Sequence, residues 1–375
     1  MMVNTRTSLQ NQSGLATLTA VLMLLIVITL VTVFTGRIKS FEHQIMLNEQ
    51  NQLMAFSAAQ AGLERGLSQL GEEPSWDGTA FTNTLPNMTQ FTVSAVEQDI
   101  ERESASLRLF TFTSVGTSAD GLGTSTQTIQ AIQYSVLANP PDVPLIVAGG
   151  LGVSGNFEVA ANPNGGGEGV PLSIWTDLNV DLTSGSGSTC GLQEFSDGNC
   201  STDTYSEKGF KDSDILDNDP AFPTDLMEYL FNVPEAEWPS LRADADERLA
   251  NCSSLDAASS GLIWVDGDCS LNANVIVGSV SDPVILVVTD GDLTMNGGAE
   301  INGMLFSFRK PGTVTDFELN MIGGARVNGV VASNHEVGHS GGTYNSVYDA
   351  DILAELEQND AFQRVAVVPG SWRDF

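Results

Sequence analysis

The chain has 375 residues and a formal net charge of -32, and 42% of its residues are hydrophobic. Residues 1–70 hold four Lys/Arg and three Asp/Glu, so residues 71–375 hold 11 basic against 44 acidic side chains. Phosphates would be repelled by so acidic a surface, which excludes nucleic acid and anionic lipid headgroups as partners of this part.

The chain begins with a polar leader, Met1 to Gly14, followed by an apolar run from Leu15 to Phe34. The run is about as long as a helix needs to be to cross a bilayer. A secretory signal peptide would have a basic start and a shorter apolar core, whereas this leader has only Arg6. The run therefore predicts a membrane-spanning helix, for which an ordinary single-pass anchor is the simpler alternative.

Apolar residues continue at helical spacing beyond the run, which predicts one helix over residues 15–70, transmembrane at first and amphipathic afterwards. At about 1.5 Å per residue this helix would be roughly 80 Å long, so only its first half fits in lipid. The stripe consists of Ile38, Phe41, Ile45, Leu53, Phe56, Leu63, Leu67 and Leu70.

Two segments carry a family resemblance: Ser13-Gly14-Leu15 before the apolar run, and the block Ala55-Phe56-Ser57-Ala58-Ala59-Gln60-Ala61-Gly62-Leu63. Together they resemble the N-terminal region of PilX-type minor pilins of type IV pili. The resemblance implies that a prepilin peptidase cuts after Gly14 and that the new N-terminus, Leu15, is methylated. It also implies an inner-membrane precursor with a periplasmic soluble part, later moved into a pilus at the cell surface. The implied partners are other minor pilins, the major pilin, a tip adhesin and the inner-membrane assembly platform, and no cofactor is expected.

Thr19 departs from the family pattern, because most pilins have Glu at the fifth mature position. That carboxylate is thought to neutralise the N-terminal amine of a neighbouring subunit, and a buried amine without a partner is costly. Thr19 therefore favours a place at the filament tip, with a role in pilus initiation, adhesion or twitching motility. A type II secretion pseudopilin is the alternative, although its soluble part would be mostly helical. Arg37 and Lys39 after the run give no clear positive-inside signal.

The remaining sequence predicts an α+β fold: a long pilin helix with a small antiparallel sheet at residues 71–139, then a β-solenoid-like, mainly β domain at 145–375. Alternating apolar and polar residues run from Gln90 to Val136, and the segment 139–144 is a Pro-rich break. Beyond it, Leu293–Ser307 aligns without gaps on Leu319–Ser333, with eight identities in 15 positions at a period of 26. Such a period predicts stacked solenoid coils, of which Leu151–Val159 would be an earlier one.

An insertion at about residues 184–260 is expected to interrupt these coils. Four cysteines in or beside it form two close pairs that predict disulfides in an oxidising compartment, with zinc as the weaker alternative: Cys190 with Cys200 and Cys252 with Cys269. The acidic stretch Asp212–Asp219 lacks the EF-hand order, so a solvated loop is expected, with calcium as the alternative. Two short helices are expected near Thr224–Phe231 and Leu241–Ala250, with Thr224, Asp225 and Ser240 as candidate N-caps.

One motif has the pattern of a zinc protease, His335-Glu336-Val337-Gly338-His339, which matches H-E-x-x-H. The position that would supply a third histidine is Asn345, and Glu355 and Glu357 lie too close to His339 for the other common arrangement. Glycines at 338, 341 and 342 also disfavour the helix that the motif requires. We therefore expect another β segment here and no enzyme, with a membrane-anchored metalloprotease as the alternative.

Overall fold

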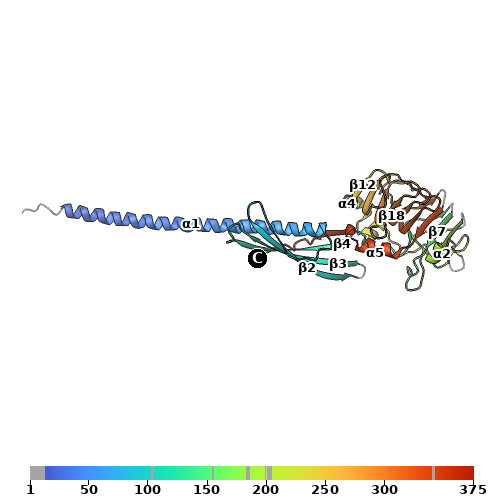
Figure 1. The fold of residues 1–375 in the computed structure, drawn as a ribbon, viewed down its shortest axis with the longest axis horizontal. Coiled ribbons are helices and arrows are strands. Elements are labelled where there is room, and N and C mark those ends of the chain that lie inside the picture. Colours follow the sequence, from blue (N-terminus) through green and yellow to red (C-terminus); the bar gives the residue numbers. More distant parts are fainter. Residues whose placement is uncertain are drawn as a thin grey trace, which may run out of the picture.

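The computed structural model describes residues 13–102, 105–153, 156–182, 186–198, 200, 205–339 and 343–375. Its longest element is the helix α1, Ser13–Glu72, whose first part projects alone from the rest of the molecule (Figure 1). Residues 73–375, here called the head, are mainly β. The predicted α+β class, with a long N-terminal helix followed by a β-rich part, is confirmed.

The last part of α1 lies across an antiparallel sheet that begins the head (Figure 1). Its strands occur in the order β1-β2-β3-β4-β23, and β24 also pairs with β4. Leu63 and Leu70 of the helix pack with Phe91, Phe110 and Phe112 of the sheet in one core. The strands are β1 Phe81–Thr84, β2 Gln90–Arg102, β3 Ala105–Thr117, β4 Thr124–Ser135, β23 Gln363–Val367 and β24 Arg373–Asp374.

The two copies of the sequence repeat lie side by side as parallel strands, in the register of the repeat. Leu293 pairs with Leu319 and Glu300 pairs with Arg326, each 26 residues apart. We call the region from β5 to β22 the parallel β domain. Its longest sheet has the order β10-β7-β22-β20-β18-β16-β13-β12, and β5, β8, β11 and β15 pair beside it. These strands are β5 Leu145–Val147, β7 Asn156–Ala160, β8 Ile174–Thr176, β10 Ser186–Cys190, β11 Ile215–Leu216, β12 Glu247–Leu249, β13 Gly261–Asp266, β15 Ile276–Val277, β16 Val284–Thr289, β18 Glu300–Phe308, β20 Arg326–Ser333 and β22 Thr343–Val347.

Two smaller parallel sheets complete this domain, in the orders β14-β17-β19 and β21-β6-β9. Because apolar residues fill both faces of the central strands, one core lies between the sheets and a second lies outside the longest sheet. Leu286 of β16 belongs to the inner core, whereas its neighbours Ile285 and Val287 belong to the outer one. The strands are β6 Leu151–Val153, β9 Val180–Asp181, β14 Cys269–Leu271, β17 Leu293–Met295, β19 Leu319–Met321 and β21 Val337–His339.

Short helices cover the outer core and contribute buried side chains to it. The helix expected near Thr224–Phe231 is α3, capped by Asp225, whose side chain accepts from the backbone N–H of Glu228 at 2.8 Å. The helix expected at Leu241–Ala250 is wrong in extent, because α4 ends at Ala243. The helices are α2 Leu192–Ser196, α3 Leu226–Phe231, η1 Glu235–Glu237, α4 Trp238–Ala243, α5 Ala350–Gln358 and η2 Asp360–Phe362.

The residues after α4 extend the sheet instead of the helix. Glu247 pairs with Ile263 of β13, so pairing at the edge of the sheet is more favourable for these residues than continuing the helix. Ser240 is not an N-cap, since its hydroxyl donates to the carbonyl oxygen of Glu237 within the helix. The expected insertion is likewise not separate, because β10, β11 and β12 all pair with strands of the parallel β domain.

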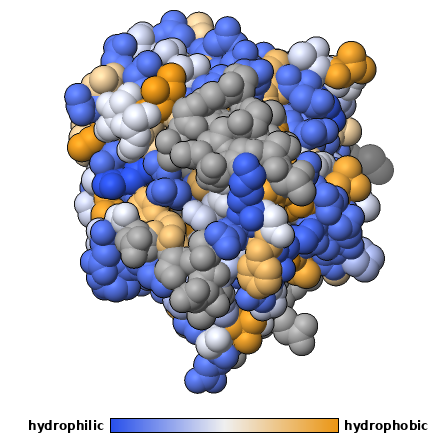
Figure 2. All heavy atoms as spheres, turned by 90° about the vertical axis from the view of Figure 1, so that its right-hand side faces the viewer, coloured by the Kyte–Doolittle hydropathy of each residue, from blue (hydrophilic) through white to orange (hydrophobic). Residues whose placement is uncertain are grey.

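The chain does not end in the parallel β domain. After α5 it returns to the antiparallel sheet, where Val365 pairs with Gln133 and Arg373 pairs with Thr128. The expected unit of residues 145–375 therefore gives up its last strands to the first sheet. At the end of the head farthest from the free part of α1, the described atoms are mostly hydrophilic with scattered hydrophobic residues (Figure 2).

Candidate assembly surface of the N-terminal helix

The first part of α1 presents apolar side chains on every side. Residues 15–50 are exposed along their whole length, and the sequence has no charged residue between Leu15 and Gly36. By length and composition the helix is able to cross a membrane. This composition supports membrane anchoring of the type found in pilins.

Thr19 lies within this apolar segment and uses its hydroxyl inside the helix. The hydroxyl donates to the carbonyl oxygens of Leu15 at 3.1 Å and Ala16 at 2.9 Å. Thr29 and Thr32 bond back to their helix in the same way. Position 19 therefore contributes no charge with which to neutralise an amine.

The second part of α1 packs on the sheet with its smallest side chains. Ala55, Ala58 and Ala59 are fully buried there, in the block that carries the family resemblance. Leu63 and Leu70 of the expected apolar stripe are buried as well, but Leu53 is 70% exposed. The stripe predicted the buried face correctly only where the sheet covers the helix.

Glycines on both sides make this contact close. A Cβ added to Gly62 would lie 2.1 Å from Ser114 Oγ, and one added to Gly116 of β3 would lie 2.1 Å from the carbonyl oxygen of Ala55. Real Cβ contacts are never that short, so both positions need glycine. The family-like block therefore has a physical function, which is to let the helix backbone approach the sheet.

Polar side chains of the sheet hold the helix at two points. Gln127 Nε2 donates to the carbonyl oxygen of Phe56 at 3.0 Å, and Gln133 Nε2 donates to that of Pro74, just after the helix, at 2.9 Å. Arg108 also contacts Pro74 and forms an ion pair with Glu97. The hydrogen bond from Arg108 keeps the pKa of Glu97 below its usual value. The hydropathy pattern did not indicate these contacts, because glutamines in strands carry no specific signal.

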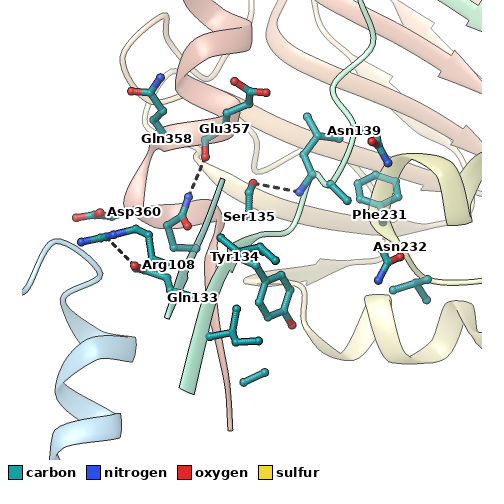
Figure 3. Close-up of a pocket in the computed structure, with 17 residues that line it drawn as sticks. Arg108, Gln133, Tyr134, Ser135, Asn139, Phe231, Asn232, Glu357, Gln358 and Asp360 are labelled. Carbon is teal, nitrogen blue, oxygen red and sulfur yellow. Dashed lines mark hydrogen bonds between the residues drawn. The ribbon is translucent and has the colours of Figure 1, made fainter. Parts of the chain in front are cut away.

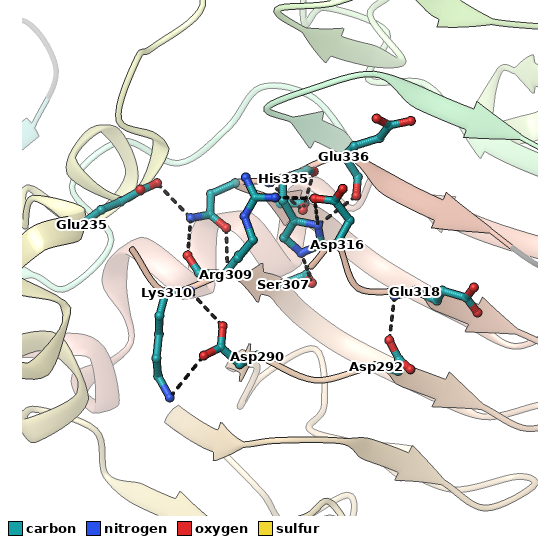
Figure 4. A network of polar contacts seen from close by, with 12 residues as sticks. Glu235, Asp290, Asp292, Ser307, Arg309, Lys310, Asp316, Glu318, His335 and Glu336 are labelled. Carbon is teal, nitrogen blue, oxygen red and sulfur yellow. Dashed lines mark hydrogen bonds and ion pairs between the residues drawn. The ribbon is translucent and has the colours of Figure 1, made fainter. Parts of the chain in front are cut away.

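The protease-like motif has a different geometry from a zinc helix (Figure 4). Residues Val337–His339 form β21, which pairs with β6. His335 is buried; its Nδ1 donates to the carbonyl oxygen of Glu336 at 2.8 Å and its Nε2 accepts from the Ser307 hydroxyl at 2.9 Å. Burial lowers the pKa of His335, so the ring is neutral at neutral pH.

Both ring nitrogens of His335 are thus occupied by protein groups, and the Glu336 carboxylate points away from the ring (Figure 4). Among the described residues, no group of three or more His, Cys, Asp or Glu is placed to hold a metal ion. The expected β segment is present, and His335 belongs to the packing of the domain.

The cysteines and the acidic stretch are structural as well. Cys190 is bonded to Cys200 and Cys252 to Cys269, as predicted. The expected solvated loop is wrong for Asp214, which is buried and accepts hydrogen bonds from Ser173 at 2.7 Å and Ser206 at 2.6 Å. These hydroxyl donors meet the needs of the buried carboxylate without a cation.

A groove of about 850 Å³ lies between the antiparallel sheet and the parallel β domain (Figure 3). It is lined by Tyr134 of β4, Phe231 of α3 and Glu357 of α5, among others. Burial raises the pKa of Glu357, and Asp142 adds a smaller effect of the same sign. No sequence pattern indicated this groove, because its walls come from segments far apart in the chain.

One comparison with known proteins, a family model, concerns the N-terminal helix. The family model described as PilX N-terminal matches residues 13–64, and a comparison with curated proteins finds no match. Among solved structures, the competence-associated pilin ComZ from Thermus thermophilus matches over 87% of this chain and 98% of that chain, with 14% identity and a TM-score of 0.24. The family-model match confirms the resemblance expected from Gly14 and the Ala55–Leu63 block, and residues 13–64 resemble the N-terminal segment of PilX-type proteins.

Proposed function

We propose that this protein is a minor pilin of a type IV pilus that takes its place at or near the tip of the filament. The observation that supports this most directly is the PilX-type segment at residues 13–64, folded as a helix whose apolar half is free of the head. Such a helix is suited to lie first in a bilayer and then among other helices, since both environments are apolar.

The proposal includes the processing implied by the family. A prepilin peptidase cuts after Gly14 and the new N-terminus at Leu15 is methylated. The precursor waits in the inner membrane with its head in the periplasm, in agreement with two disulfides in the head. Its partners are other minor pilins, the major pilin, a tip adhesin and the assembly platform. Its function is assembly and display, without catalysis.

The tip position rests on Thr19 and on the size of the head. Because Thr19 carries no charge and its hydroxyl donates to its own helix, position 19 leaves a neighbour's amine without a counter-charge. An unpaired buried amine costs several kcal/mol, on the order of the desolvation penalty of one ion. A head made of residues 73–375 would also be difficult to repeat along a tightly packed shaft. Both features favour a subunit that has nothing above it.

Immunogold labelling of pili tests this proposal. We expect wild-type label at filament ends only, and Thr19→Glu to place some label along the shaft because it supplies the missing carboxylate. Thr19→Val, which adds no charge, is the matched control and keeps the label at the ends. Gly14→Leu blocks cleavage and gives pili without label. Wild-type label scattered along the filaments would refute the tip position.

A further inference from the structure

Large apolar side chains are exposed where α1 enters the head. Leu53 of the helix is 70% exposed, Leu122 in the turn between β3 and β4 is 79% exposed, and Phe375 after β24 is 77% exposed. Trp372 beside them is 46% exposed. We call these four residues the collar.

The collar is held in place by contacts between its segments. Asn51 Nδ2 donates to Asp120 Oδ2 at 2.6 Å, which fixes the turn that carries Leu122. The Trp372 ring packs edge-on against Phe56 with 6.3 Å between centroids, and the Phe375 N–H bonds to the carbonyl oxygen of Thr126 at 2.9 Å. A hollow of about 360 Å³ opens among these segments, lined by Gln52, Leu53, Phe56, Ser125, Asp374 and Phe375. A preformed apolar surface of this kind needs little rearrangement to bind a partner.

Lipid is the wrong occupant for the collar. The uncharged part of α1 ends at Gly36, and Arg37 and Lys39 follow it. At about 1.5 Å per residue, roughly 25 Å of helix separates Gly36 from Leu53. A helix that spans the bilayer with its apolar part therefore holds the collar well outside the hydrocarbon.

The collar continues into an uncovered face of the helix. Ile38, Phe41 and Ile45 are 43%, 65% and 58% exposed and lie at spacings of three and four residues. Phe56 follows Ile38 by about five helical turns, so it lies on the same side of α1. The free part of α1, which carries this apolar face, projects from one end of the head (Figure 1).

Charge indicates what can cover this surface. Glu49, Asp120 and Asp374 are exposed around the collar, with Arg373 next to them. A second copy would bring a head with 43 acidic against 11 basic side chains, so it would be repelled. A partner with apolar side chains next to Lys or Arg would be attracted.

We propose that the collar is the docking surface for the head of a different pilin-type subunit, one that presents an apolar patch beside basic side chains. This rests on the proposed function, since a subunit at the tip has its neighbours below its head. The collar then lies on the neighbour's head, and the helix face at Ile38, Phe41 and Ile45 contacts the same neighbour below that head.

Incorporation of the full-length protein into pili tests the surface. Leu122→Glu and Phe375→Glu place a charge on exposed positions, so they should leave the membrane pool unchanged and lower the pilus-bound fraction about tenfold or more. Val314→Glu is the matched control, because Val314 is 91% exposed on the parallel β domain. If both collar variants enter pili as well as the wild type, the collar proposal is wrong. If the wild type itself is absent from pili, the proposed function fails instead.

Two measurements identify the occupant. With p-benzoylphenylalanine at position 375 in cells, we expect a cross-link to another pilin-type subunit that is lost in the Leu122→Glu background. A cross-linked pair of copies of this chain, or no cross-linked subunit, would overturn the assignment. The fluorescence of Trp372 is the difference between the emission of the wild type and that of Trp372→Phe. In vesicles of dibrominated phosphatidylcholine, whose bromines quench tryptophan in the lipid, we expect this Trp372 emission to remain unquenched. Quenching of that emission would identify lipid as the occupant and overturn the proposal.

Discussion

At the scale of single residues, glycines of α1 lie at its contact with the antiparallel sheet. Gly62 faces Ser114, and Gly66 faces Val93 and Phe112 at about the limit of contact, 3.0 Å from an added Cβ. Glycine normally weakens a helix by about 0.5–1 kcal/mol relative to alanine. Here that loss is offset by the burial of Phe91 and Phe112 directly against the helix backbone.

Gly62→Val should therefore destabilise the helix–sheet unit by about 2–3 kcal/mol, as overpacking of a close contact does. Gly71→Ala is the matched control on the same helix, because nothing lies within 4 Å of its added Cβ. It should leave stability equal or raise it by about 0.5–1 kcal/mol. Urea unfolding of the full-length protein in detergent, followed by circular dichroism, measures both. Equal losses in the two variants would show that helix propensity, and not the contact, determines the result.

The same residues show what sequence can and cannot reveal. The family resemblance identified the Ala-Gln-Ala-Gly-Leu block from the sequence. It did not indicate that the block packs closely on a sheet, because small residues are common in helices. Leu53 belongs to the predicted apolar stripe and is exposed, since periodicity does not tell which part of a stripe a sheet covers. The collar was missed because its members come from three distant segments.

At the scale of elements, the two disulfides differ in what surrounds them. Cys252 and Cys269 both belong to the inner core of the parallel β domain, whereas Cys200 is only half-buried. Entropy alone predicts about 3 kcal/mol for loops of either length. A difference in stability between variants that lack one disulfide or the other should therefore come from the thiols or hydroxyls that the substituted residues leave in the core.

We expect the double substitution Cys252→Ser and Cys269→Ser to lower the Tm of the head more than Cys190→Ser with Cys200→Ser. Differential scanning calorimetry of the full-length protein gives both values. Non-reducing mass mapping of the wild type should first find the pairs Cys190–Cys200 and Cys252–Cys269. Free thiols or crossed pairs there, or the reverse order of Tm, would contradict the expectation.

The elements were predictable where the sequence repeats itself and not where tertiary pairing decided. The period of 26 predicted the register of Glu300 with Arg326 correctly, because each repeat buries the same positions. The end of α4 was missed, since β12 forms only by pairing with β13. The motif at His335 was correctly expected to be β, because its glycines disfavour a helix.

At the scale of the whole molecule, the last strands of the chain return to the antiparallel sheet that begins the head. β23 and β24 both pair with β4, so residues 363–374 complete a sheet whose other strands lie at 81–135. Ser371 Oγ accepts a hydrogen bond from the Gln130 N–H at 3.0 Å across 241 positions of sequence. No local pattern predicts such a contact.

Truncation after Phe362 should leave one edge of β4 open. We expect faster hydrogen exchange at β4 amides and proteolysis within the antiparallel sheet, with the parallel β domain unchanged. The variant Phe375→Ala, which keeps both strands and the backbone bond from residue 375 to Thr126, is the control and should exchange as the wild type does. Unaltered exchange in β4 of the truncated protein would mean that β23 and β24 contribute little to the stability of the sheet.

If the head is exported as proposed, this closure also sets an order of events during export. As the chain emerges from the translocation channel, the segment at residues 81–135 arrives long before the strands that complete it. An open strand edge is prone to pair with other chains, and non-local contacts form slowly. On that proposed route, the first sheet would need protection until the entire parallel β domain has crossed the membrane. A holding chaperone that acts in that interval would then limit how much of the proposed pilin reaches the filament.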